Sequence, residues 1–92
     1  MIQSIKGKAL ELYFYKNDTS KLTADHVPRI NSILSQLSAA TKPEQMNMPG
    51  SDYHRLKGKL KNFYSVKVKA NWKIIFRFKD GSFFDVEYTD YH

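Results

Sequence analysis

Cysteine is absent from the 92-residue sequence. Its absence excludes a disulfide framework, a zinc site built from thiolates and a cysteine nucleophile. Long apolar runs are also missing, because the longest, residues 12–15, is far shorter than the roughly 20 residues that span a bilayer. The start of the chain has no apolar stretch of the kind found in signal peptides. We therefore expect a cytoplasmic protein without a membrane segment.

Interdomain linkers, internal repeats and low-complexity tracts are missing as well. The hydrophobic content of 41% and the aromatic content of 14% are too high for a disordered chain. A chain of this length buries roughly 60–70% of its unfolded surface, which is enough for one core. The sequence therefore predicts a single domain over residues 1–92.

Acidic side chains are missing from one long segment. The chain has 15 basic and 9 acidic residues, a net charge of +6, yet residues 53–79 contain nine basic side chains and no carboxylate. An ordinary solvated surface mixes both signs. We therefore expect an acidic partner, either a nucleic acid or an acidic protein, with a merely solubilising surface as the alternative.

Helical patterns are confined to the N-terminal half. Residues 8–16 favour a short helix, which turn-forming residues then end. Apolar residues at three- and four-residue steps over residues 27–37 predict a second helix. We expect this helix to begin near residues 24–26, with Pro28 in its first turn, and to end near residue 39 or 40. His26, at the polar start, is expected to be solvated.

The second half of the chain alternates between apolar and polar residues. Residues 64–68, 72–78 and 84–88 each follow this pattern, which predicts three half-buried strands. Residues 2–5 and 53–56 can add short strands. One face of the sheet is then apolar, and we expect the two helices to cover it.

The turn after residue 79 decides which side chains face the core. A two-residue loop would pair Arg77 with Phe84 and mix core with solvent positions. A three-residue loop, residues 79–81, would instead pair Phe76 with Phe84, Ile74 with Val86 and Trp72 with Tyr88, and would place Gly81 at a left-handed position. We therefore predict the three-residue loop and an open, basic outer face carrying Ser65, Lys67, Lys69, Lys73 and Arg77.

Two histidines flank the predicted basic strands. His54 begins a motif that contains Lys57, and His92 is the last residue, after Asp90 and Tyr91. Histidine exchanges protons near neutral pH, and lysine neutralises phosphate. This set suits RNA cleavage without a metal, in which the 2′-hydroxyl loses a proton and the 5′-leaving oxygen gains one. No motif indicates a cofactor, and the alternative is that both histidines are ordinary surface residues.

Four motifs follow one another in the second half of the chain: His54-x-Leu56-Lys57-Gly58, then Tyr64-Ser65-x-x-Val68-x-x-Asn71-Trp72-Lys73-Ile74-x-Phe76, then Asp80-Gly81, and finally Asp90-Tyr91-His92. Their order and spacing resemble the HigB toxins of the RelE/ParE superfamily of toxin–antitoxin systems. The resemblance covers essentially the whole chain. It implies an α+β, RelE-like fold, with two N-terminal helices packed on a small, mainly antiparallel twisted sheet.

The resemblance also implies an activity and a site. The activity is that of a ribosome-dependent mRNA endonuclease, or mRNA interferase, which inhibits translation by cutting mRNA in the ribosomal A site. His54 and His92 would form the acid–base pair, with the choice of base left open, while the other site positions are Lys57, Lys73, Asp90 and Tyr91. The family commonly has arginine at the position of Lys73, and a lysine keeps the charge but loses the bidentate fork. We predict RNA contacts from Arg55, Lys67, Lys69 and Arg77.

The implied partners are a HigA-like helix-turn-helix antitoxin, the 70S ribosome with its mRNA, and operator DNA for the toxin–antitoxin complex. Two other functions stay open. One is a ParE-like toxin that poisons gyrase, against which the two histidines argue. The other is a non-catalytic module that binds RNA or the ribosome, for which histidine substitutions would leave the effect unchanged.

Overall fold

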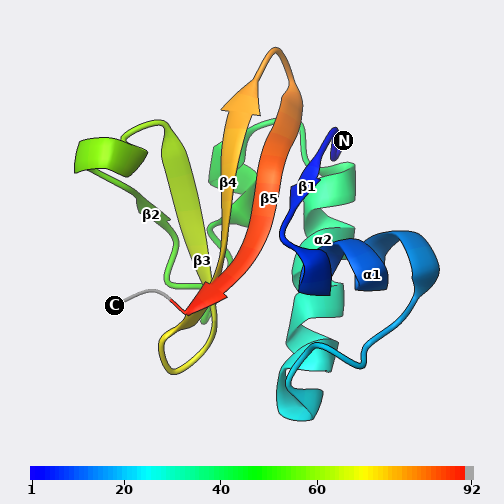
Figure 1. Cartoon of the computed structure of the whole chain (residues 1–92). Coiled ribbons are helices and arrows are strands. Elements are labelled where there is room, and N and C mark those ends of the chain that lie inside the picture. The colour runs from blue at the N-terminus through cyan, green and yellow to red at the C-terminus, as the bar shows by residue number, and fades with distance from the viewer. Residues whose placement is uncertain (91–92) are drawn as a thin grey trace.

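A five-stranded sheet with two helices on one face makes up the fold, in a computed structural model that describes residues 1–90 (Figure 1). The sheet order is β1-β5-β4-β3-β2, and only β1 runs parallel to its neighbour. The strands are β1 Ile5–Lys6, β2 His54–Arg55, β3 Phe63–Lys69, β4 Trp72–Lys79 and β5 Ser82–Asp90. The predicted α+β class and its mainly antiparallel sheet are confirmed.

Both predicted helices are present, as α1 Lys8–Lys16 and α2 Val27–Ala39. α1 ends because Asn17 adopts a left-handed conformation, with φ 55°, and donates its N–H to the carbonyl of Tyr13. α2 follows a 3₁₀ turn, η1 Ala24–His26, and Pro28 lies in its first turn, where no intrahelical donor is lost. Within residues 1–90, neither helix is long and apolar enough to cross a membrane.

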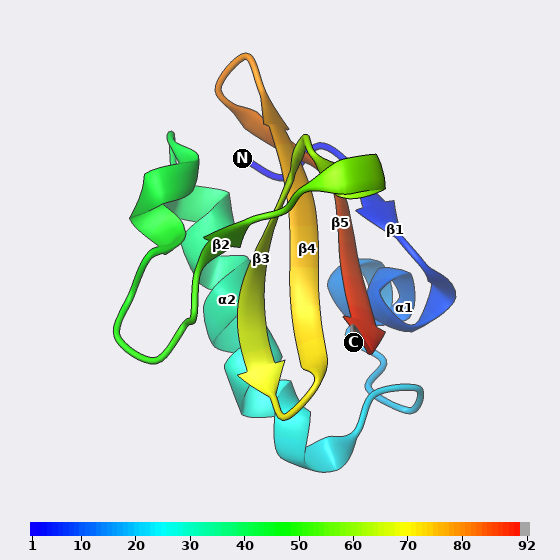
Figure 2. The same cartoon turned by 90° about the vertical axis from the view of Figure 1, so that its left-hand side faces the viewer.

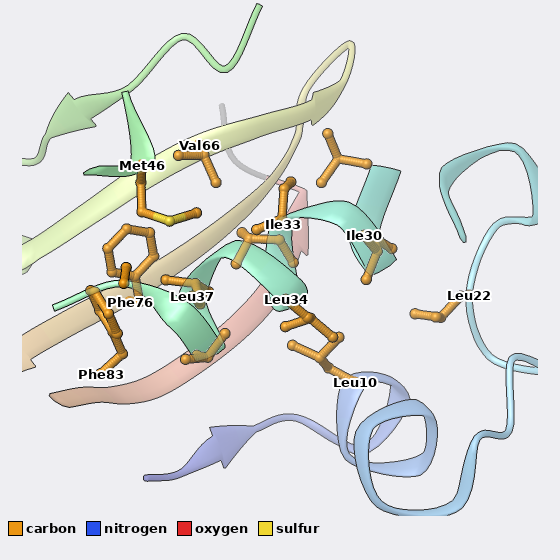
Figure 3. Packing of buried hydrophobic residues seen from close by; sticks show 14 residues of the cluster. Leu10, Leu22, Ile30, Ile33, Leu34, Leu37, Met46, Val66, Phe76 and Phe83 are labelled. Atoms are coloured by element: carbon orange, nitrogen blue, oxygen red, sulfur yellow. The ribbon is translucent and has the colours of Figure 1, made fainter. Parts of the chain in front are cut away.

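The core lies between the helices and one face of the sheet (Figure 3). From α2, Ile30, Ile33 and Leu37 are fully buried, and they meet Phe76 of β4 and Phe83 of β5. Further core side chains come from the other elements: Leu10 of α1, Val66 of β3, Val86 of β5 and Met46 of the 3₁₀ turn η2 Pro43–Met46. The helices therefore cover the apolar face as predicted, and no α-helix covers the opposite, outer face within residues 1–90.

The β4–β5 turn has two residues, so the predicted three-residue loop is wrong. Lys79 pairs with Ser82, and the two residues between them, Asp80 and Gly81, have φ 51° and 81°. Positive φ at both central positions is what a type I′ hairpin turn requires. Asp80 tolerates that conformation better than most residues with a side chain.

A β-bulge in β5 explains why the predicted register fails. Asp85 has φ 52°, and the register shifts there, because two residues of β5, Asp85 and Val86, lie opposite Phe76. The extra residue reverses which face the following side chains take. Phe83, before the bulge, and Val86, its second residue, are therefore both fully buried.

Three predicted side-chain placements are corrected by this bulge. Phe84 was expected in the core, but it pairs with Arg77 on the outer face. Ile74 pairs with Tyr88 instead of Val86, and Trp72 pairs with Asp90 instead of Tyr88. The predicted register requires β5 to be a regular strand, in which one register holds from end to end.

The expectation that His26 is solvated is also wrong. Its side chain is 6% exposed, and Nδ1 lies 2.7 Å from the hydroxyl of Tyr88. The η1 turn directs the imidazole toward the sheet, where its ring lies 5.9 Å from that of Trp72. A buried polar group needs a hydrogen-bond partner, and Tyr88 supplies it. His26 is therefore a structural histidine.

Candidate active site

Two neighbouring rows of paired residues place His54 and Lys73 on the outer face of the sheet. His54 pairs with Ser65, and Ser65 pairs with Ile75. In the next row of this face, Lys67 pairs with Lys73. Paired residues share a face, and so do alternate residues along a strand. His54 and Lys73 therefore come from strands at different positions in the sheet but lie in adjacent rows.

Asp52, which the sequence analysis missed, joins these two side chains. Its Oδ1 lies 2.9 Å from Nε2 of His54, and its Oδ2 lies 3.7 Å from Nζ of Lys73. Asp52 stands one residue before the acid-free segment, so the count of charges within that segment did not include it. Its position two residues before His54 was the only signal in the sequence.

The outer face is less open than predicted. β2 lies beside β3 at the edge of the sheet, and the segment that follows it, with the 3₁₀ turn η3 Gly58–Leu60, crosses in front of the upper part of the neighbouring strands (Figure 2). Ser65 and Ile75 are on this face, yet they are only 1% and 5% exposed. The uncovered part of the face lies toward the end of β3, the start of β4 and the end of β5. Lys73 is there, with a side chain that is 17% exposed.

Carboxylates from outside the acid-free segment also pair with its cations. Nε of Arg77 lies 2.8 Å from Oδ2 of Asp85, at the bulge. Nζ of Lys69 lies 3.7 Å from Oδ2 of Asp25, which belongs to η1 in the helical layer. Lys69 therefore does not point to the outer face as predicted, because β3 is irregular between Lys67 and Lys69. Folding brings together charges that the sequence keeps apart.

A cationic hollow of about 270 Å³ lies at the other end of β4. Its lining residues are Arg55, Asn62, Tyr64, Arg77, Phe78 and Lys79. The guanidinium of Arg55 lies 5.9 Å from the ring centre of Tyr64. The segment that carries η3 adds three exposed lysines: Lys57, Lys59 and Lys61. Of the predicted site residues, Arg55 and Arg77 line this hollow, and Lys57 follows Arg55 closely along the chain.

The end of β5 approaches the His54–Lys73 region. Thr89 pairs with Lys73, and Asp90, the next residue, is exposed and pairs with Trp72. Tyr91 and His92, which were predicted as site residues, lie outside the described residues. The structure thus brings together His54 and Lys73 and places Asp90 next to their part of the sheet. Within residues 1–90, no group of three or more His, Cys, Asp or Glu side chains is placed to hold a metal ion.

Tyr53, beside this region, supports the sheet edge by stacking. Its ring is 5.8 Å from that of Tyr64, which in turn is 5.9 Å from that of Phe76. Burial raises the pKa of Tyr53 from its ordinary value near 10 to about 12, and the nearby Tyr64 and Glu44 add to the effect while Arg55 opposes it.

This shift predicts a loss of stability in alkaline solution. Above about pH 10 the unfolded chain releases the Tyr53 proton, while the folded chain keeps it up to about pH 12. Deprotonation therefore stabilises the unfolded state and lowers the free energy of unfolding. We expect the urea midpoint to fall more between pH 9.5 and pH 11.5 for the wild type than for Tyr53→Phe. Equal falls in both proteins would contradict this assignment, because the two proteins differ only in the Tyr53 hydroxyl.

Comparison with known proteins identifies the family. A family model described as the RelE-like toxin of the type II toxin–antitoxin system HigB matches residues 3–92. The chain therefore belongs to this family of toxins, which confirms the resemblance read from the motifs. Over its whole length it is also 40% identical to the Endoribonuclease HigB of Proteus vulgaris, and the alignment covers 100% of both chains.

Solved structures share the fold at low sequence identity. The YoeB dimer from Staphylococcus aureus matches with a TM-score of 0.62 and 18% identity, over 99% of this chain and 97% of that one. The YoeB–YefM complex from the same organism matches with a TM-score of 0.63 and 18% identity, over 100% of this chain and 98% of that one. The arrangement of two helices on this sheet is therefore shared with other bacterial proteins.

Proposed function

We propose that this toxin is a ribosome-dependent mRNA endonuclease that inhibits translation by cleaving mRNA in the ribosomal A site. The observation that carries the proposal is the cluster of His54, Asp52 and Lys73 on the outer face of a chain that belongs to the HigB-like toxins. An imidazole able to move a proton and an ammonium able to neutralise a phosphate are the groups that RNA cleavage requires.

The proposed reaction is an attack within the RNA strand. The 2′-oxygen forms a bond to the adjacent phosphorus as its proton passes to a general base, and the bond from phosphorus to the 5′-oxygen breaks as that oxygen takes a proton from a general acid. The products are a 2′,3′-cyclic phosphate and a 5′-hydroxyl. His54 and His92 are proposed as the proton-transfer pair. Lys73 and Lys57 stabilise the extra negative charge at phosphorus, Asp90 orients one of these groups, and Tyr91 positions the base or the attacking hydroxyl.

The ribosome supplies what the toxin lacks. Most of the proposed site residues within residues 1–90 are exposed. An mRNA held in the A site is presented with its reacting atoms aligned, and alignment of this kind contributes a large part of a catalytic effect. The exposed cations of the β2–η3 segment, together with Arg55 and Arg77 in the hollow, would contact phosphates along the mRNA or ribosomal RNA.

The direct test is cleavage of a defined mRNA on purified ribosomes. We expect a cut within the A-site codon, with a 2′,3′-cyclic phosphate and a 5′-hydroxyl at the new ends. Ribosome binding without any cut would establish the non-catalytic module instead. Inhibition of gyrase supercoiling without mRNA cleavage would establish a ParE-like activity. A product with a 5′-phosphate would exclude the proposed 2′-hydroxyl attack.

Ribosome binding should weaken as salt concentration rises. Each phosphate contact releases condensed counterions, so the logarithm of the association constant falls linearly with the logarithm of the salt concentration. We expect Lys57→Gln to reduce this slope by about 1, as the loss of one phosphate contact does. Lys8→Gln, which removes an exposed lysine from α1 in the helical layer, is the matched control and should leave the slope unchanged. A wild-type slope of zero would contradict RNA contacts by this surface.

We further propose the partners that a toxin of this family requires. A HigA-like helix-turn-helix antitoxin would bind the toxin, and their complex would bind operator DNA. The solved YoeB–YefM complex pairs a toxin of similar fold with its antitoxin. Expression of the wild-type toxin alone should arrest growth, and expression together with a HigA-like antitoxin should restore it.

A further inference from the structure

We propose that Asp52 is a positioning residue that presents the Nδ1 atom of His54, and the ammonium of Lys73, to the RNA. This inference rests on the proposed function, because it assigns a residue to that site. Asp52 accepts from Nε2 of His54 through one carboxylate oxygen and faces Nζ of Lys73 through the other. One side chain thus contacts two of the described groups that the proposed reaction uses, the imidazole of His54 and the ammonium of Lys73.

Hydrogen bonds of the preceding residue, Ser51, hold the backbone at Asp52 in place. Ser51 is fully buried, and its carbonyl accepts a 2.7 Å hydrogen bond from the backbone N–H of Lys67 in β3. The N–H of Ser51 donates to the carbonyl of Met48, and the Ser51 hydroxyl accepts from the N–H of Met48. Two residues after Asp52, His54 joins β3 through its pairing with Ser65. Asp52 is therefore fixed between two points attached to the same strand.

Asp52 also adopts an unusual backbone conformation, with φ 48°. Aspartate, asparagine and glycine tolerate this left-handed region better than other residues. The conformation turns the chain sharply between the buried Ser51 and the edge strand β2. It lets the carboxylate of Asp52 fold back toward the imidazole two residues later.

The hydrogen bond determines which nitrogen of His54 carries the proton. An ionised carboxylate only accepts hydrogen bonds, so Nε2 of His54, 2.9 Å away, is the protonated nitrogen of the neutral ring. Nδ1 then carries the lone pair and is the atom that can take a proton from a 2′-hydroxyl. An aspartate that fixes a tautomer in this way is a familiar means of orienting a catalytic histidine.

Stability does not explain the arrangement. The side chains of His54 and Asp52 are 60% and 52% exposed, and ion pairs of such exposure contribute little to the free energy of folding. The Asp25–Lys69 pair has the same 3.7 Å separation as the Asp52–Lys73 pair but lies at the helical layer. This second pair provides a matched control for the loss of one aspartate charge.

The test compares Asp52→Asn and Asp52→Gly with Asp25→Asn. Asparagine keeps a hydrogen-bond acceptor and tolerates the backbone conformation, whereas glycine tolerates the conformation and removes the side chain. Three quantities are measured: the single-turnover cleavage rate on saturating programmed ribosomes, the ribosome affinity, and the melting temperature. The His54 tautomer of the free toxin is read from the ¹⁵N chemical shifts of its imidazole.

We expect the cleavage rate to fall about 10- to 100-fold in Asp52→Gly and less in Asp52→Asn, because misplacement of a catalytic group by about 1 Å can cost about 100-fold. The wild type should show His54 protonated at Nε2, and Asp52→Gly should show a mixture of tautomers. Asp25→Asn should match the wild type in rate and tautomer.

Two outcomes would overturn the proposal. The first is an Asp52→Gly variant with the wild-type rate and tautomer. The second is faster cleavage with tighter ribosome binding, since the carboxylate would then occupy the place of the RNA phosphate. If the wild type itself does not cleave mRNA, the proposed function fails, and the tautomer measurement still tests whether Asp52 positions His54.

Discussion

Phe76→Ala is expected to lower the free energy of unfolding by about 3–5 kcal/mol, as the truncation of a buried phenylalanine typically does. Phe76 is fully buried, and its ring contacts those of Phe83, at 5.3 Å, and Tyr64, at 5.9 Å. It lies opposite the β5 bulge and beneath α2, so neighbouring groups cannot easily fill the space that its ring leaves. A domain of this size is stable by only about 5–14 kcal/mol, and the variant should lose much of that stability.

Urea unfolding followed by circular dichroism measures this effect. Tyr15→Ala is the control, because Tyr15 lies on α1 with 62% of its surface exposed, and its removal should change stability by much less than the truncation of Phe76. Phe76→Leu fills part of the space and should give an intermediate loss. A loss below about 1 kcal/mol for Phe76→Ala would show that this ring is not central to the core.

His54→Gln is expected to reduce mRNA cleavage by about 10²- to 10⁴-fold, which is the usual cost of losing one proton-transfer group. Glutamine can still donate a hydrogen bond to Asp52, but it cannot accept and release a proton near neutral pH. The side chain of His54 is 60% exposed, so the melting temperature should change by no more than a few degrees. Single-turnover cleavage on programmed ribosomes and thermal unfolding measure the two effects separately.

The other described histidine provides the contrasting control. His26→Gln should reduce stability, because it disturbs the buried contact with the hydroxyl of Tyr88, and it should leave the cleavage rate of the folded protein near that of the wild type. Near-normal cleavage by His54→Gln would remove His54 from the reaction. The proton transfers would then have to be assigned to other groups, with His92→Gln as the next variant to measure.

Periodic patterns in the sequence were sufficient to predict the main elements. The three- and four-residue spacing predicted α2, the turn residues after Lys16 predicted the end of α1, and the alternation predicted β3, β4 and β5. These are local properties, because the spacing of apolar residues within each element depends on that element's own sequence. The family could also be recognised from the sequence, because its motifs follow one another in a fixed order from His54 to His92.

Contacts between distant residues could not be predicted in the same way. The bulge at Asp85 has no local sequence signal, and its place depends on Arg77 and on Ser4, whose hydroxyl accepts from the N–H of Asp85. The burial of His26 depends on Tyr88, which lies 62 residues further along the chain. The contact between Asp52 and Lys73 in the candidate site could not be predicted either, because the ion pair forms only when β2 and β4 lie on the two sides of β3.

The pairing of β1 with β5 has a consequence for the order in which the toxin folds. Ile5 pairs with Val86, and Ile2 forms a bridge with Phe83, so two segments that are far apart in the sequence lie side by side in the sheet. Contacts of such long sequence separation form late and slow the folding of small domains. β1 can join the sheet only when β5 is in place, and we therefore expect this edge of the sheet to be completed last.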